Sequence, residues 1–158
     1  MRIRRELQVL LRQTKLLICI YVKAVYDFIV IRGAVYFSLV FAVGFILGVI
    51  RVTWIVPQFG ERAAELMEAP LMLAAIYVAA RFVTRRFRAL RVMDYLYSGL
   101  IALLLLLTVE FSVVLGLRGL SIREYLEARD PVAGAVYVMM LIIFAVMPWL
   151  VGNRHTAA

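Results

Sequence analysis

Two charged residues lie inside long apolar stretches of this 158-residue chain, and their opposite charges point to ionic chemistry. Arg51 and Glu110 each precede the residue that ends a predicted helix, Pro57 and Gly116, by the same interval. At 1.5 Å of rise per residue, both lie about 9 Å inside the same membrane boundary. A charge at that depth costs ~3 kcal/mol on insertion scales, so we expect the two side chains to form an ion pair.

Two interpretations of the expected Arg51–Glu110 pair stay open. A structural clamp would fix the register of two helices. A gate or substrate site would open to bind a polar or anionic group. Buried ion pairs are retained for conformational specificity in some proteins and for function in others, so residue types alone do not decide.

A second set of charged residues is acidic and follows these two helices. Its members are Glu61, Glu65, Glu68, Glu124, Glu127 and Asp130. Within each segment the spacing of three or four residues puts the carboxylates on one helix face. Such oxygen ligands suit Ca²⁺ or Mg²⁺, whereas the interleaved arginines favour weak surface pairs. We expect an external acidic rim and no metal site.

Catalytic and cofactor chemistry have little support. The single histidine, His155, has no acidic neighbour in sequence, and the single cysteine, Cys19, excludes an internal disulfide. No phosphate-binding glycine loop is present, and one histidine cannot supply two haem ligands. We therefore expect no enzyme activity and no cofactor, and nothing specific favours a carboxylate-based membrane hydrolase.

The composition is that of a membrane protein. Apolar residues make up 65% of the chain, charged residues 18%, and the mean hydropathy is +0.95. Soluble domains have roughly half apolar and a quarter charged residues. These values exclude an ordinary soluble domain, a disordered chain and a disulfide-rich secreted module. The net charge is +8, but in so apolar a chain we expect no nucleic-acid partner.

The apolar stretches predict four membrane helices arranged as two hairpins, over residues 33–83 and 95–153. An Arg-rich loop, 84–94, joins the hairpins, and 154–158 form a short tail. Basic residues concentrate before the first span, in the loop and in the tail. The positive-inside rule therefore predicts a multi-pass protein with both termini and the loop in the cytoplasm.

Residues 1–32 form a separate predicted element. A polar stripe recurs at helical spacing on an otherwise apolar segment, at Arg5, Gln8, Arg12, Lys15, Cys19, Lys23 and Asp27. We expect an amphipathic helix in the plane of the cytoplasmic leaflet. A fifth, partly buried helix in an oligomer is the alternative. A signal peptide is disfavoured because Lys23 and Asp27 interrupt the apolar region.

The two predicted hairpins share a sequence pattern, G-x4-E-x2-E-A, that begins at Gly60 and again at Gly119. Each occurrence precedes a proline, Pro70 or Pro131. The pattern favours an internal duplication with both halves in the same orientation. Coincidence is the alternative, because loops between spans often reuse glycine, glutamate and proline.

Two further motifs indicate contacts with lipid or with another helix. The arginine cluster after the second span comprises Arg85, Arg86, Arg88 and Arg91. It would attract anionic lipid headgroups at ~1 kcal/mol per residue, or would only set the topology. Gly44 and Gly48 form a G-x-x-x-G pattern, which allows close helix packing within the bundle or between subunits.

Residues 33–83 resemble small four-span bacterial inner-membrane proteins of uncharacterised function. The resemblance rests on Arg51, Pro57, Gly60, Glu61, Glu65, Glu68 and Pro70. It implies a bacterial inner membrane and no particular activity. The expected function is a non-enzymatic accessory or assembly component that packs against other membrane proteins or itself. The alternative is a small transporter or channel that uses the Arg51–Glu110 pair.

Overall fold

The chain is almost entirely helical over the residues that the computed structural model describes, 2–89, 91–117 and 131–156. α1 runs over Arg2–Ile50 and continues into a π-helical turn, η1, over Arg51–Ile55. The other helices are α2 over Val56–Arg86, α3 over Val92–Leu117 and α5 over Pro131–Thr156. No strand occurs among these residues, so the predicted all-α class is confirmed.

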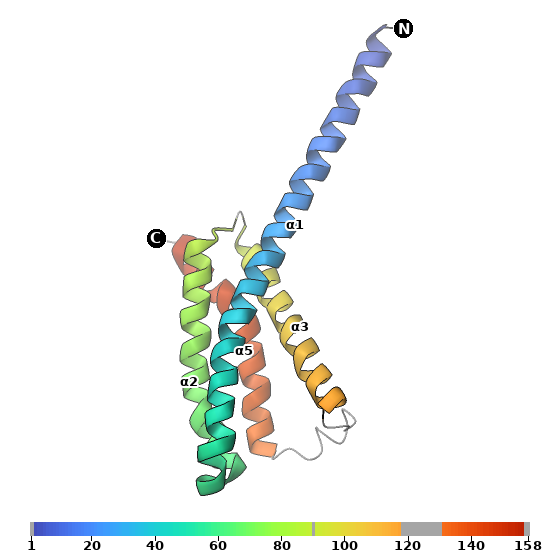
Figure 1. The fold of residues 1–158 in the computed structure, drawn as a ribbon. Helices are drawn as coiled ribbons and strands as arrows, with labels where there is room; N and C mark the ends of the chain where they lie inside the picture. The colour runs from blue at the N-terminus through green and yellow to red at the C-terminus, as the bar shows by residue number, and fades with distance from the viewer. Residues whose placement is uncertain (1, 90, 118–130, 157–158) are drawn as a thin grey trace.

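Three helical stretches of the described chain are long and apolar enough to cross a membrane. They are Ile20–Arg86, Val92–Ser112 and Gly134–Arg154. The first contains a reversal of the chain, because α1 and α2 lie side by side and run in opposite directions (Figure 1). In length and apolarity, these helices are those of a membrane protein.

Three local features build the reversal between α1 and α2. η1 is wider than an α-helix, because its hydrogen bonds join residues five apart. Pro57 lies in the first turn of α2, directly after η1, and has no N–H to donate to the preceding turn. Gly60 has φ of 79° and ψ of 165°, a conformation that a side chain would oppose. The remainder of α2 then runs antiparallel to α1.

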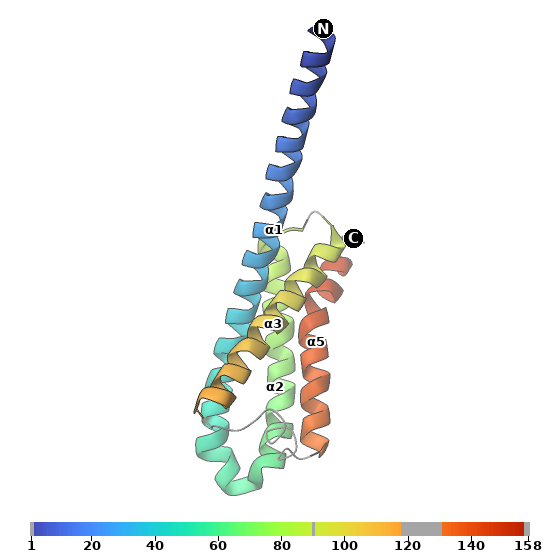
Figure 2. The ribbon, with the colours of Figure 1, turned by 90° about the vertical axis from the view of Figure 1, so that its right-hand side faces the viewer.

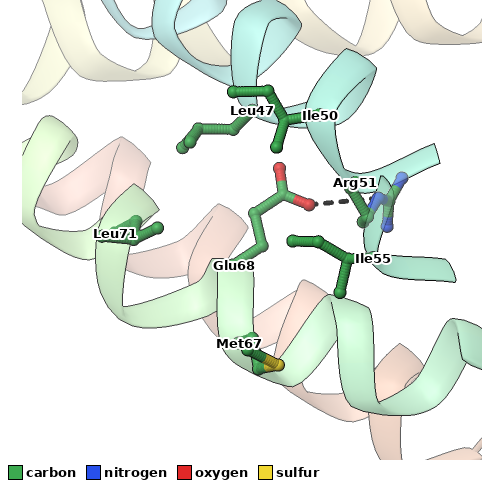
Figure 3. Close-up of a pocket in the computed structure, with 7 residues that line it drawn as sticks. All are labelled: Leu47, Ile50, Arg51, Ile55, Met67, Glu68 and Leu71. Carbon is green, nitrogen blue, oxygen red and sulfur yellow. Dashed lines mark ion pairs between the residues drawn. The ribbon is translucent and has the colours of Figure 1, made fainter. Parts of the chain in front are cut away.

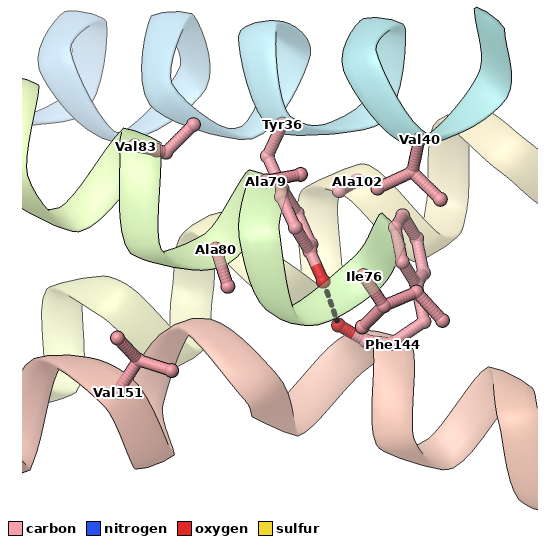
Figure 4. Close-up of a cluster of buried hydrophobic side chains, with 9 residues drawn as sticks. All are labelled: Tyr36, Val40, Ile76, Ala79, Ala80, Val83, Ala102, Phe144 and Val151. Carbon is pink, nitrogen blue, oxygen red and sulfur yellow. Dashed lines mark hydrogen bonds between the residues drawn. The ribbon is translucent and has the colours of Figure 1, made fainter. Parts of the chain in front are cut away.

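The four α-helices pack as a bundle in which α1 contacts α2 and α3, and α5 contacts the same two helices (Figure 2). α1 therefore has an antiparallel neighbour in α2 and a parallel neighbour in α3. Side chains from all four helices fill the core (Figure 4): Tyr36, Val40, Ile76, Ala79, Ala80, Val83, Ala102, Phe144 and Val151.

Tyr36 connects α1 to α5 across this core. Its ring stacks on Phe144 with 4.8 Å between centroids, and its hydroxyl donates to the Phe144 carbonyl oxygen at 3.0 Å (Figure 4). That carbonyl lacks its usual helical donor, because the residue four positions on is Pro148, which has no N–H. Tyr36 therefore satisfies a buried acceptor that Pro148 leaves open.

Close approach between helices depends on three glycines, each on a different helix. A Cβ at Gly33 of α1 would lie 2.7 Å from a backbone oxygen of α3. A Cβ at Gly99 of α3 would overlap the α5 backbone at Ala145, and one at Gly152 of α5 would overlap the Tyr95 ring. None of the three belongs to the G-x-x-x-G pattern.

The two glycines of that pattern differ in the structure. A Cβ at Gly44 would lie 3.2 Å from the methyl group of Met72, so Gly44 packs against α2 of the same chain. A Cβ at Gly48 would meet no atom within 4 Å. The pattern therefore predicts one intramolecular contact, and its second position is open.

α1 does not divide at residue 32, where the sequence predicts a junction between an in-plane helix and the first span. It is one helix of 49 residues, about 73 Å long, and its N-terminal part projects beyond the bundle along the same line (Figures 1 and 2). Burial in the bundle already begins at Ile29 and Arg32. No proline or glycine precedes Gly33, so nothing interrupts the backbone hydrogen bonds. The in-plane orientation of residues 1–32 stays a prediction.

Candidate functional site

Arg51 lies between two carboxylates of α2, at the end of the bundle where the chain reverses. Its Nη1 is 3.2 Å from Glu65 Oε1, and its Nε is 3.1 Å from Glu68 Oε2. The three side chains are 16 to 27% exposed, so water screens these contacts only partly. We refer to Arg51, Glu65 and Glu68 as the ionic cluster.

The hairpin geometry brings the ionic cluster together. Arg51 is the first residue of η1, where α1 ends. Glu65 and Glu68 are three residues apart and therefore share one face of α2. Because α2 runs back along α1 after Gly60, that face meets Arg51 across the hairpin. A wide π-helical turn at this position is a feature often associated with functional sites.

The structure does not bring Arg51 to Glu110, the pairing that the sequence predicts. Glu110 instead accepts a hydrogen bond from the Tyr137 hydroxyl, which joins α3 to α5. Arg51 finds its carboxylates within its own hairpin, whose antiparallel arm supplies Glu65 and Glu68 at short sequence separation. The candidate for a structural clamp or a gate is therefore the ionic cluster and not an Arg51–Glu110 pair.

Arg51 is shared between the two carboxylates of the ionic cluster, so Glu68 has no cation to itself. The Nε atom of Arg51 is buried. It lies within ion-pair distance of Glu68, but the two atoms do not meet at the angle of a hydrogen bond. Glu68 can therefore interact with a second cation besides the shared Arg51.

A small pocket of about 110 Å³ lies beside the ionic cluster, between α2 and the junction of α1 with η1 (Figure 3). Five of its seven lining side chains are apolar. The lining comprises Leu47, Ile50, Arg51, Ile55, Met67, Glu68 and Leu71. The carboxylate of Glu68 points into this pocket, with one oxygen directed to Arg51 and the other towards the apolar wall (Figure 3).

A buried arginine that the sequence analysis did not single out lies at the other end of the bundle. Arg32 is 2% exposed. Its Nη1 donates to Ser98 Oγ at 3.4 Å, and its Nη2 donates to the Arg88 carbonyl oxygen at 3.2 Å. The guanidinium lies 5.0 Å from the centre of the Tyr95 ring, which is the distance of a cation–π contact. Arg32 thus attaches α1 to α3 and to the loop before it.

Tyr95 and Asp94 of α3 hold the loop between α2 and α3. The Tyr95 hydroxyl accepts from the Ala89 N–H at 3.0 Å and donates to the Thr84 carbonyl at 3.4 Å. Asp94 Oδ2 accepts from the Arg91 N–H at 3.0 Å, one half of a capping box at the start of α3.

The sequence contains part of the signal for the burial of Arg32. Arg32 follows Ile29 and precedes Tyr36 at helical spacing, so the three residues share one face of α1.

The arginines of the loop are themselves exposed. The side chains of Arg85, Arg86, Arg88 and Arg91 all lie on the surface. The loop is shorter than the predicted 84–94, because α2 extends to Arg86 and α3 begins at Val92. The exposed guanidinium groups are compatible with anionic lipid headgroups, which stays a prediction.

The predicted acidic rim is described only in its first half. Glu61 is exposed, whereas Glu65 and Glu68 turn inward to Arg51. Glu124, Glu127 and Asp130 lie outside the described residues, as does half of the repeated sequence pattern. Within the described part of the chain, no group of three or more histidine, cysteine or acidic side chains is arranged to hold a metal ion.

Comparison with protein-family models, with curated proteins and with solved structures finds no match to this chain.

Proposed function

We propose that the chain is a non-enzymatic, multi-pass protein of the bacterial inner membrane, with four crossings and both termini in the cytoplasm. It acts as an accessory or assembly component that packs against another membrane protein or a second copy of itself. The orientation is supported by the basic residues of the α2–α3 loop and of the N-terminal segment. The exposed loop arginines would contact anionic lipid headgroups in the same leaflet.

The observation that carries this proposal is the projecting part of α1. A hydrocarbon core of about 30 Å needs about 20 helical residues, and the part of α1 from Ile29 to Ile50 already supplies them. Large apolar side chains continue along the projecting part and are at least 60% exposed: Leu17, Ile20, Tyr21, Tyr26 and Phe28. A helix surface of this kind outside the hydrocarbon core is the type that another protein covers.

The alternative of a transporter or channel has less support. It depended on Arg51 and Glu110 acting together, and each of them has a different partner. Arg51 already interacts with two carboxylates, so it is not poised to receive an anion. Packing against a partner protein needs no polar path through the membrane, and it uses the exposed surface of α1.

Gentle detergent extraction at native expression level, followed by mass analysis, tests the proposal. The wild-type chain should be recovered with a stoichiometric partner protein or as a defined oligomer. Phe28→Gln should lose that association, because it removes an exposed aromatic side chain, whereas Lys23→Gln on the polar stripe should retain it. A wild-type chain recovered as a monomer without any other protein would contradict the proposal.

A further inference from the structure

The pocket beside the ionic cluster combines apolar walls with a carboxylate directed into it. Ile50, Met67 and Leu71 are all exposed, so the pocket opens on the outer surface of the bundle and not into its core. That surface faces the bilayer in a membrane protein. For scale, an engineered apolar cavity of ~150 Å³ holds benzene, so 110 Å³ accommodates a group of a few non-hydrogen atoms.

Charge decides what kind of group fits. Arg51 is shared between Glu65 and Glu68, and the Glu68 oxygen that is not directed to Arg51 faces the pocket (Figure 3). An anion here would meet two carboxylates and a guanidinium that is already paired. A cation with N–H donors would instead bind the free oxygen of Glu68 through a charge-assisted hydrogen bond.

The position of the pocket along the helix fits an amphiphile. Glu68 lies eight residues past Gly60, about 12 Å along α2 from the reversal. Glu68 pairs with Arg51, which directly follows the apolar part of α1 that ends at Ile50, so the pocket lies near one end of the apolar bundle, where headgroups meet hydrocarbon. Leu47 and Leu71 lie on the pocket wall opposite the charge, where they can contact methylene groups (Figure 3).

We propose that this pocket binds the primary ammonium headgroup of a zwitterionic membrane lipid. The ammonium donates to Glu68, and the adjoining methylene groups contact the apolar wall. A quaternary trimethylammonium group has no N–H to donate and is bulkier than an aminoethyl group in a pocket of this size. The site lies far along α1 from the projecting segment, so this inference does not rest on the proposed partner contact and can fail separately.

Native mass spectrometry of the full chain in detergent, titrated with short-chain lipids, tests the site. Lipids with ethanolamine, choline and glycerol headgroups differ in the group that would enter the pocket. The ethanolamine lipid should bind roughly tenfold more tightly than the other two, as expected for one charge-assisted hydrogen bond. Free ethanolamine at the same concentration should not bind, because it lacks the chains that hold it at the bilayer.

Matched variants separate this site from general lipid adhesion. Glu68→Gln keeps the shape of the side chain and should reduce the ethanolamine lipid to the affinity of the choline lipid. Glu61→Gln, an exposed carboxylate on the same helix, should change nothing. Leu71→Trp should fill the pocket and remove the preference with the ionic cluster intact, which provides a second test if Glu68→Gln folds poorly.

Three results would overturn the inference. They are equal binding of the three lipids, an unchanged headgroup preference in folded Glu68→Gln or Leu71→Trp, and binding of free ethanolamine as tightly as of its lipid.

Discussion

Replacing Tyr36 with phenylalanine removes one oxygen atom and leaves the shape of the core intact. The Phe144 carbonyl then loses its hydroxyl donor at 3.0 Å, and Pro148 offers no N–H in its place. An unsatisfied buried acceptor costs ~1–3 kcal/mol, and hydrogen bonds between membrane helices contribute up to ~1.7 kcal/mol. Where these ranges overlap, we expect Tyr36→Phe to lower the free energy of unfolding by about 1.5 kcal/mol.

The same reasoning predicts how this change combines with Pro148→Ala. Alanine at position 148 restores an N–H, which can donate to the Phe144 carbonyl in the ordinary helical pattern. In that background, Tyr36→Phe should cost less than about 0.5 kcal/mol, which gives a coupling energy near 1 kcal/mol in a double-mutant cycle.

Reversible unfolding of the purified chain by sodium dodecyl sulfate, followed by circular dichroism, measures these free energies. Tyr97→Phe is the matched control, since Tyr97 is exposed, and it should stay within about 0.5 kcal/mol of wild type. If Tyr36→Phe costs the same with proline and with alanine at position 148, the account of the open carbonyl is refuted.

Three further changes test the packing and the charged groups. Gly99→Ala should lower the free energy of unfolding by about 1–3 kcal/mol because its Cβ meets the α5 backbone, whereas Gly48→Ala, with open space, should raise it by roughly 0.5–1 kcal/mol. Arg32→Met keeps the bulk of the side chain but removes its hydrogen bonds to α3 and to the loop before it. Hydrogen exchange of the α2–α3 loop amides should therefore accelerate about threefold or more. Arg51→Gln leaves two carboxylates facing each other and should cost about 1–2 kcal/mol in the same unfolding assay, part of which Glu65→Gln should restore.

Each of these has a contradicting outcome. A Gly99→Ala chain as stable as Gly48→Ala would show that α3 and α5 are not in backbone contact there. Unchanged loop exchange in Arg32→Met would mean that its hydrogen bonds do not hold the loop. An Arg51→Gln chain that Glu65→Gln destabilises further would argue against repulsion between the carboxylates.

Helix positions followed closely from the sequence where the apolar stretches are bounded by charge. The predicted spans over 95–117 and 131–153 correspond to α3, Val92–Leu117, and α5, Pro131–Thr156. Pro131 begins its helix as its missing N–H predicts. The junction predicted at residue 32 is absent from α1, which continues through a buried Arg32 that is packed against α3.

Side-chain partners were harder to predict than helices. Equal depth and opposite charge made Glu110 a reasonable partner for Arg51, but depth carries no information about which helices are neighbours. The reversal at Gly60 brings Glu65 nearer. Close helix contacts likewise depend on which glycines face a neighbouring backbone, and Gly99 shows no local spacing pattern that would indicate it.

Photo-crosslinking in intact cells tests most directly whether a protein covers the projecting part of α1. A photoreactive phenylalanine analogue at position 28 should give a discrete protein adduct, because Phe28 is exposed on the projecting part. The same analogue at Leu104, exposed to a similar degree on α3 within the bundle, should give lipid adducts alone. If position 28 yields lipid adducts alone, or no adduct, α1 lacks the partner on which the account depends.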